Sequence, residues 1–114
     1  MKRKFRLTRS IDFKRVRRFG RSYAHPLVVL VTLPTREPVT RIGVTAGKKV
    51  GGAVQRNRAK RLLREALRMV HPSIIQGNDL MLIARKPLPG TDMVKIQEAI
   101  DLLLKRANLI VKKT

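Results

Sequence analysis

The stretch AVQRNRAKRLLREALRMV, residues 53–70, decides the fold because two patterns are superimposed on it. Apolar side chains recur at the spacing of one helical face, and they are Ala59, Leu62, Leu63, Ala66, Leu67 and Val70. Beside them, basic and amide side chains fall within an arc of about 140° when each residue turns the helix by about 100°; they are Arg56, Asn57, Lys60, Arg61, Arg64 and Arg68. The stretch predicts a helix that packs with one face and presents a strongly basic face to a partner.

The segments around this helix are typical of strands and loops. Residues 41–46 alternate and predict a strand, and a glycine-containing loop leads from it to the helix. Pro72 ends the helix, since proline cannot continue it. The short apolar run 80–84 predicts a further buried strand, and Thr91 or Asp92 can cap a last helix. The core face of that helix comprises Met93, Ile96, Ile100, Leu103, Leu104 and Ala107.

The N-terminal third adds a helix and a strand. Ser10 is placed to cap a helix over residues 11–19, and Gly20 is placed to stop it. Residues 27–33 are rich in β-branched side chains and nearly all apolar, as expected of a strand buried on both faces. The following strand is expected to run antiparallel to it. The order is α, β, β, basic helix, β, α, and with no repeat or linker the chain is predicted to form one domain, residues 1–114.

Charge is the second strong signal. The chain has 27 lysines and arginines, seven acids, a net charge of +20 and 43% hydrophobic residues. Disorder requires low hydrophobicity as well as high charge, so a folded domain with a basic surface is expected. Residues 1–22 hold ten basic groups and one acid (+9), and residues 48–68 hold eight and one (+7). Such blocks repel one another unless a polyanion neutralises them, which predicts a nucleic acid as the partner.

The expected location follows from composition. The chain contains no cysteine, so neither a disulfide framework nor a thiolate metal site is expected. The longest apolar runs, 27–33 and 80–84, are far shorter than the roughly 18 residues of a membrane span. The charges within Phe5–Arg9 interrupt the apolar stretch that an export signal requires. We therefore expect a cytoplasmic protein that does not associate with a membrane.

No self-sufficient active site is predicted. The acids are scattered rather than clustered for metal-ion catalysis, at Asp12, Glu37, Glu65, Asp79, Asp92, Glu98 and Asp101. His25 and His71 each precede a proline, which favours boundary positions over a general acid and base. The loop 47–52 lacks the Gly-Lys-Ser/Thr ending of a P-loop and fits contacts to RNA phosphates better. Neither catalytic residues nor a protein-held metal ion is expected in this chain.

Base-specific RNA recognition is not expected either. Both principal strands lack the aromatic pair on which an RNA-recognition sheet stacks bases. The aromatic residues are Phe5, Phe13, Phe19 and Tyr23. Phe13 admits two interpretations, a core anchor or a platform for a nucleotide, and both stay open at this point.

Residues 48–65, KKVGGAVQRNRAKRLLRE, closely resemble the signature of the protein subunit of bacterial ribonuclease P, in which an Arg-Asn-Arg motif opens a long basic helix. Residues 7–20 resemble the first helix of that family, 41–44 the strand before the loop, and 83–87 the last strand. The resemblance implies an α+β fold, a single-domain α/β sandwich of order αβββαβα with a four-stranded sheet and a left-handed β-α-β crossover. It therefore adds one strand that the local patterns do not predict.

The resemblance also implies that the chemistry belongs to another molecule. In this family the catalyst is an RNA, whose bound magnesium ions activate the water that cleaves the 5′ leader from precursor tRNA. The chain would be the protein subunit of that endoribonuclease, with one protein per catalytic RNA and Mg²⁺ held mainly by the RNA. A structural RNA-binding protein of ribosomal type is the alternative, while a nuclease acting alone is disfavoured by the scattered acids.

Two surfaces are implied by position in the family's motifs. The residues expected to contact the catalytic RNA are Arg9, Lys48, Lys49, Arg56, Asn57, Arg58, Lys60, Arg61 and Arg64. The residues expected to line a cleft for the single-stranded leader are Phe13, Arg17, Val31, Arg85 and Lys86. Arg17 and Val31 stand where other members can carry an aromatic, and Gly47 stands where the family has a serine. Leader binding is therefore expected to depend more on charge than on stacking.

Overall fold

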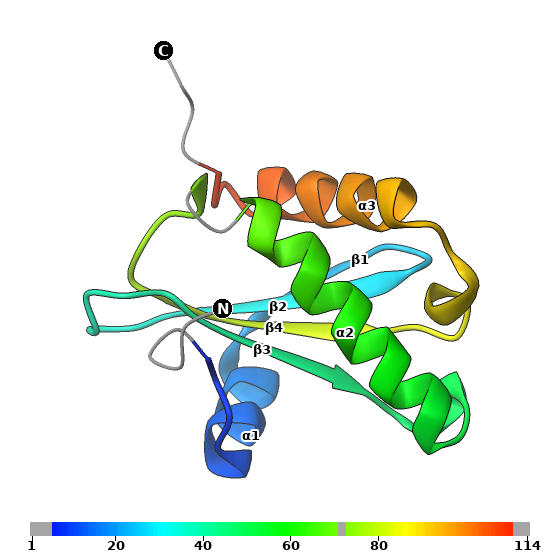
Figure 1. The fold of residues 1–114 in the computed structure, drawn as a ribbon. Coiled ribbons are helices and arrows are strands. Elements are labelled where there is room, and N and C mark those ends of the chain that lie inside the picture. Colours follow the sequence, from blue (N-terminus) through cyan, green and yellow to red (C-terminus); the bar gives the residue numbers. More distant parts are fainter. Residues whose placement is uncertain (1–5, 71–72, 111–114) are drawn as a thin grey trace.

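A four-stranded sheet forms the middle layer of the protein (Figure 1). The structure is a computed structural model, and it describes residues 6–70 and 73–110. In spatial order the strands are β1 (Arg21–Ala24), β2 (Val28–Pro34), β4 (Asn78–Ala84) and β3 (Arg41–Ala46). β2 is antiparallel to both of its neighbours, whereas β3 and β4 are parallel. The sheet is therefore mixed, with β2 and β4 at its centre.

Helices cover both faces of the sheet. α2 (Ala53–Val70) and α3 (Met93–Arg106) lie on one face, and α1 (Ser10–Phe19) lies on the other (Figure 1). Short 3-10 turns, η2 (Lys48–Val50) and η4 (Leu88–Gly90), precede α2 and α3. The chain order is αβββαβα, as the resemblance implies. α2 connects the parallel strands β3 and β4 across one face of the sheet, and this β-α-β crossover is left-handed.

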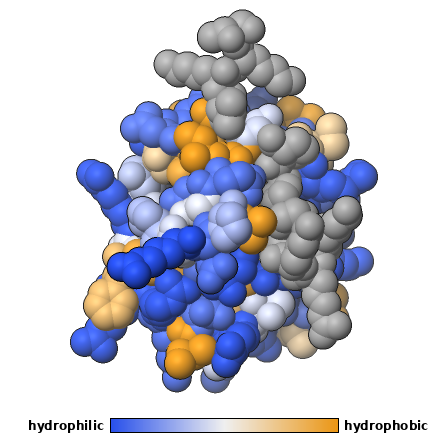
Figure 2. All heavy atoms as spheres, turned by 90° about the vertical axis from the view of Figure 1, so that its left-hand side faces the viewer, coloured by the Kyte–Doolittle hydropathy of each residue, from blue (hydrophilic) through white to orange (hydrophobic). Residues whose placement is uncertain are grey.

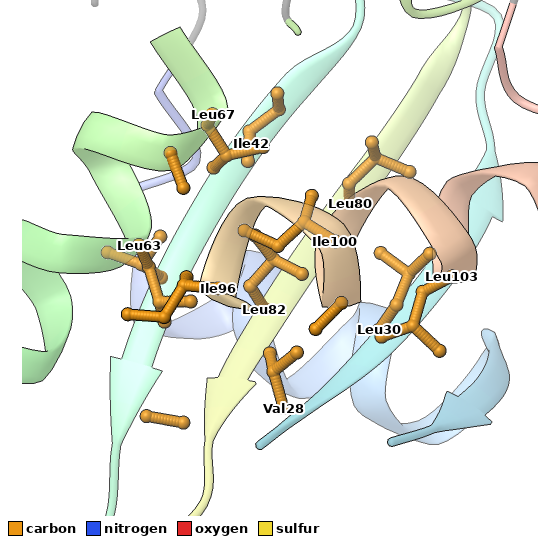
Figure 3. Packing of buried hydrophobic residues seen from close by; sticks show 14 of the residues in the cluster. Val28, Leu30, Ile42, Leu63, Leu67, Leu80, Leu82, Ile96, Ile100 and Leu103 are labelled. Carbon is orange, nitrogen blue, oxygen red and sulfur yellow. The ribbon is translucent and has the colours of Figure 1, made fainter. Parts of the chain in front are cut away.

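The main core lies between the sheet and the helices α2 and α3 (Figure 3). Its residues are supplied by β2, β3, β4 and both helices, and those labelled in the figure are Val28, Leu30, Ile42, Leu63, Leu67, Leu80, Leu82, Ile96, Ile100 and Leu103. Each such side chain stabilises the fold by about 1.5–3 kcal/mol when fully buried. The apolar stripe predicted in residues 53–70 therefore anchors the basic helix to the sheet.

A smaller apolar cluster lies on the opposite face, under α1. It consists of Leu7, Val16, Val31 and Met81, and the partly buried Phe13 packs against it. Successive residues of a strand point to opposite faces, so β2 and β4 supply side chains to both cores. This arrangement explains why β2 is apolar along almost its whole length, as a strand buried on both faces should be.

α1 differs from its sequence prediction at both ends. The N-cap residue is Arg9, and its side chain makes no cap hydrogen bond; the helix already includes Ser10, so the prediction that Ser10 caps it is wrong. Gly20 does end the helix, but its φ of −79° is not left-handed. A Cβ at Gly20 would lie 2.4 Å from the carbonyl oxygen of Val16. Close packing, rather than a left-handed turn, therefore requires the glycine.

The other elements agree more closely with the predictions. α2 has the predicted bounds, and Asp92 caps α3 by accepting a hydrogen bond from the backbone N–H of Lys95 at 3.0 Å. β4 begins two residues before the predicted run, at Asn78. β3 runs antiparallel to β2 as expected, although β4 lies between them. The predictions for His71 and Pro72 fall outside the described residues.

Gly43 in β3 provides a test of the packing under α1. A Cβ there would lie 2.5 Å from Cε1 of Phe13 and 2.9 Å from the carbonyl oxygen of Leu7. We expect Gly43→Ala to displace the ring and to lower the free energy of unfolding by about 1–3 kcal/mol in urea denaturation. Gly90→Ala, which enters open space, is the control and should change it by less than about 0.5 kcal/mol. Equal stabilities of the two variants would contradict this packing.

Candidate nucleic-acid interface

The polar side chains of α2 lie beside its buried stripe. Ala59, Leu63, Ala66 and Leu67 are buried against the sheet and α3. The residues predicted to meet the catalytic RNA are exposed or half-buried, and on α2 they are Arg56, Asn57, Arg58, Lys60, Arg61 and Arg64. Arg9, predicted to belong to the same surface, is exposed just before α1. α2 thus combines an anchored face with an accessible basic face.

The two arginines of the Arg-Asn-Arg motif differ in their surroundings. Arg58 Nε donates a hydrogen bond to the carbonyl oxygen of Pro89 in η4, at 2.9 Å. Arg56 Nε is buried and has no acceptor within residues 6–70 and 73–110. A buried donor without an acceptor costs about 1–3 kcal/mol. Arg58 is therefore partly committed to the fold, whereas the buried Nε of Arg56 is not held by the described chain.

A hollow of about 460 Å³ lies where β3 and β4 end, and we call it the strand-end hollow. Parallel neighbours end at the same edge of a sheet, so the residues that follow them meet there. Lys48 and Lys49 of η2 line it on one side, and Arg85 and Lys86 after β4 line it on the other. All four side chains are exposed, and no acid is among the lining residues. The hollow is therefore an accessible concavity of one charge sign, suited to phosphate groups.

Phe13 lies between two further hollows. One, of about 180 Å³, is also lined by Lys60 and Arg64 of α2, and we call it the β3-edge hollow. The other, of about 300 Å³, is also lined by Lys14 and Arg17, and we call it the α1-side hollow. The ring packs against the small apolar cluster and still reaches both hollows. The core-anchor interpretation of Phe13 is therefore confirmed in part, and the nucleotide-platform interpretation stays a prediction.

The five residues predicted to form the leader cleft do not share one cavity. Phe13 and Arg17 line the α1-side hollow, while Arg85 and Lys86 line the strand-end hollow. Val31 is 2% exposed and packs in the cluster under α1. The structure therefore places Val31 beneath the helix as a support, and it groups Arg85 and Lys86 with two lysines that were predicted to contact the other RNA.

Four charged residues that were not predicted to act together form an ionic cluster, the Asp79 cluster. Asp79 is fully buried and accepts hydrogen bonds from Arg41 Nε at 3.1 Å and Arg41 Nη2 at 2.9 Å. Arg15 of α1 donates to the same carboxylate and also pairs with Asp12 at 3.3 Å. Arg41 lies 3.7 Å from Asp12. The cluster thus links α1 to the first residues of β3 and β4.

The hydrogen bonds to Asp79 raise the pKa of both Arg15 and Arg41, against an opposing effect of desolvation. Both guanidinium groups are therefore charged at neutral pH. The sequence carried one local signal of this cluster, the i,i+3 spacing of Asp12 and Arg15. The pairing of Arg41 with Asp79 had none, because it depends on the parallel register of β3 and β4.

The composition of the surface is suited to a polar partner. Figure 2 shows the face that lies on the left of Figure 1, where hydrophilic residues dominate and hydrophobic residues are exposed only as small separate areas. Among the described residues, no three or more His, Cys, Asp or Glu side chains are grouped to hold a metal ion. No helix in the described ranges combines the length and the apolar composition needed to cross a membrane.

Comparison with known proteins gives consistent matches along the chain. The family model described as Ribonuclease P matches residues 1–108. The ribonuclease P protein component of Natranaerobius thermophilus is 42% identical over 106 residues, which cover 93% of this chain and 92% of the relative. That of Chloroflexus aurantiacus is 38% identical over 115 residues, covering 100% of this chain and 85% of the relative.

Solved structures show the same fold. The ribonuclease P protein of Staphylococcus aureus matches with a TM-score of 0.81 at 33% identity, covering 93% of this chain and 97% of the other. That of Thermotoga maritima matches with a TM-score of 0.79 at 30% identity, covering 89% and 96%. Fold and basic surfaces together define an RNA-binding subunit of a ribonucleoprotein.

The chain belongs to the ribonuclease P protein family. It is the protein component of ribonuclease P, the ribonucleoprotein endoribonuclease of tRNA 5′ processing. Membership implies that it associates with ribonuclease P RNA and precursor tRNA.

The hydrogen bond from Arg58 predicts a stability difference between two arginines of the same helix. Arg58→Ala should lower the free energy of unfolding by about 1 kcal/mol, because it removes the bond to Pro89. Arg61→Ala removes the same charge from an exposed position and should stay within about 0.5 kcal/mol of the wild type. Urea denaturation measures both. If the two variants are equally stable, the bond to Pro89 contributes nothing to folding.

Proposed function

We propose that this protein contacts two RNAs at once, the catalytic RNA through α2 and the 5′ leader of precursor tRNA through the α1 side of the sheet. The observation that supports this most directly is the β3-edge hollow, which Phe13 shares with Lys60 and Arg64. Because the two surfaces adjoin there, a leader bound beside α1 lies next to the RNA bound along α2. The protein thereby assists endonucleolytic removal of the leader, and the cleavage chemistry is carried out by the RNA.

The catalytic-RNA surface is proposed to run from the N-terminus of α1 to the basic face of α2. Its contacts are expected to be phosphate contacts, which position an RNA without reading its sequence. Arg61 and Arg64 are strong candidates for such contacts, because their side chains are exposed on the basic face of α2. The full set is Arg9, Lys48, Lys49, Arg56, Asn57, Arg58, Lys60, Arg61 and Arg64.

The leader surface is proposed to combine one stacking platform with several charges. Phe13 offers its ring in the α1-side hollow, where Lys14 and Arg17 can meet phosphates. Arg85 and Lys86 extend this positive surface into the strand-end hollow. A base stacked on one aromatic contributes about 1–3 kcal/mol and any base can do so. Such a surface accepts leaders of different sequence.

Magnesium is proposed to reside on the RNA. Mg²⁺ prefers oxygen ligands, whereas the surfaces described above present lysines and arginines. Asp12 and Asp79 do carry carboxylate oxygens, but these are already paired with arginines. The side chains of these described surfaces therefore do not fit a magnesium site. We propose one protein per catalytic RNA, acting in the cytoplasm, where it neutralises phosphates that would otherwise demand more Mg²⁺.

Reconstitution at low magnesium tests this function. Adding the protein to the catalytic RNA should stimulate cleavage of precursor tRNA. The affinity of the protein for the catalytic RNA should fall as the salt concentration rises. Replacing Lys48 and Lys49 together by Gln should reduce the slope of log affinity against log salt by about 1.4–1.8, because two phosphate contacts are lost.

The control for this experiment removes two charges elsewhere. Lys95 and Lys105 are exposed on α3, and their replacement together by Gln should leave the salt slope and the stimulation unchanged. A wild-type protein that gives no stimulation at low magnesium would refute the proposed function. If both double variants lose the same amount of salt slope and of stimulation, RNA binding depends only on the net charge of the protein.

Phe13 is expected to act on the leader specifically. Phe13→Ala should weaken binding of leader-bearing precursor by about fivefold or more, the equivalent of one lost stacking contact, and should spare mature tRNA. Phe19→Ala is the matched control, because Phe19 lies on the same helix, is 66% exposed and lines neither hollow beside Phe13. Equilibrium binding of both tRNA forms to the holoenzyme measures the difference. Equal weakening for both forms would mean that Phe13 acts only as a core anchor.

A further inference from the structure

Asp79 joins α1 to the sheet through one buried carboxylate. It is the second residue of β4, it is 0% exposed, and in the parallel register it lies opposite Arg41 of β3. Arg41 holds the carboxylate with two donors, and Arg15 reaches it from α1. The carboxylate is therefore shared between a neighbouring strand, whose place is fixed by the sheet, and a helix that is not part of the sheet.

Besides this cluster, α1 contacts the sheet mainly through apolar side chains on one of its sides. It is ten residues long, shorter than the roughly 12–15 residues at which an isolated helix becomes stable, and Val16 is its only buried residue. Phe13 is partly buried against the same small cluster, and since it is three residues from Val16, both apolar contacts lie on one side of the helix. A polar contact at Arg15, about 100° around the helix from Val16, opposes a roll of the helix about that side.

A charged link suits this position because the surroundings are strongly basic. α1 carries four lysines and arginines but one acid, so the rest of a chain with a net charge of +20 repels it. The Asp79 cluster pairs two carboxylates with two arginines and is neutral. α1 is thus held at a point where its own charge is balanced.

The roll of α1 decides where Phe13 and Arg17 point. These residues are four apart, so they lie on one side of the helix, and both line the α1-side hollow together with Thr45 of β3. We propose that Asp79 is a positioning residue for leader recognition: by holding Arg15 it sets the roll of α1 and so places Phe13 and Arg17. This inference rests on the proposed binding of the leader beside α1.

The test uses the reconstituted holoenzyme with two variants that break the link from different sides. Asp79→Asn removes the buried charge, and Arg15→Met removes the bond from α1 to Asp79 while the pair between Arg41 and Asp79 stays intact. Both should raise KM for leader-bearing precursor by about fivefold, as loss of one stacking contact would. In both, kcat and the affinity for the catalytic RNA should stay within about twofold of the wild type, because the lost interaction is one of uniform substrate binding.

A double variant separates positioning from general destabilisation. Asp79→Asn combined with Phe13→Ala should raise KM no further than Phe13→Ala alone, because both act on the same contact. Asp101→Asn is the control: it breaks an exposed ion pair with Lys105 on α3, 2.9 Å long, and should leave KM unchanged. Urea unfolding of each free protein confirms that the variants are folded under assay conditions.

Three results would overturn the inference. They are an unchanged KM in Asp79→Asn and Arg15→Met, an equal loss of affinity for the catalytic RNA, and additive effects of Asp79→Asn and Phe13→Ala. A different result would refute the proposed function itself, namely a wild-type holoenzyme that binds leader-bearing precursor no better than mature tRNA. The wild-type comparison therefore distinguishes the two failures.

Discussion

Leu30 and Val31 are adjacent in β2, yet they belong to different cores: Leu30 packs under α2 and α3, and Val31 packs under α1. β4 repeats this arrangement, with Met81 facing α1 and its neighbours Leu80 and Leu82 facing the main core. Because successive strand residues face opposite sides, a strand that is apolar throughout requires a cover on each face of the sheet. This requirement places α2 and α3 on one side and α1 on the other (Figure 1).

The same requirement separates the two basic blocks of the sequence and then brings them together at one strand. α1 belongs to the first block and α2 to the second, and the sheet lies between them. β3 is one of the two edge strands of that sheet, so side chains from both faces can meet around it. They do so at the β3-edge hollow, where Phe13 from one face meets Lys60 and Arg64 from the other. Covering a sheet that is apolar on both faces with basic helices thus produces two basic surfaces that adjoin along one edge.

Features that depend on residues close together in the sequence could be predicted, and features that depend on distant residues could not. The bounds of α2 were predictable because its periodicity is local, and the cap of α3 by Asp92 likewise depends on residues three apart. β1 could not be found from its own four residues, which are mostly exposed and lack a clear pattern; only the family resemblance implied it.

The strand-end hollow and the Asp79 cluster required the parallel pairing of β3 with β4, which brings Arg41 and Asp79 together from 38 positions apart. Local patterns contain no information on that pairing. The family resemblance placed Val31 in the leader cleft by position alone, which could not reveal that Val31 is buried under α1.

Most of the acids of the chain take part in contacts within the fold. Five of the seven have partners within the fold: Asp12 and Asp79 hold arginines, Asp92 caps α3, and Glu65 and Asp101 form ion pairs on α2 and α3. The exposed pairs of Glu65 and Asp101 contribute little, whereas the buried Asp79 is committed to two arginines. Most of the acids of this chain therefore make contacts within the fold, and the basic surfaces that they leave uncompensated are available to RNA.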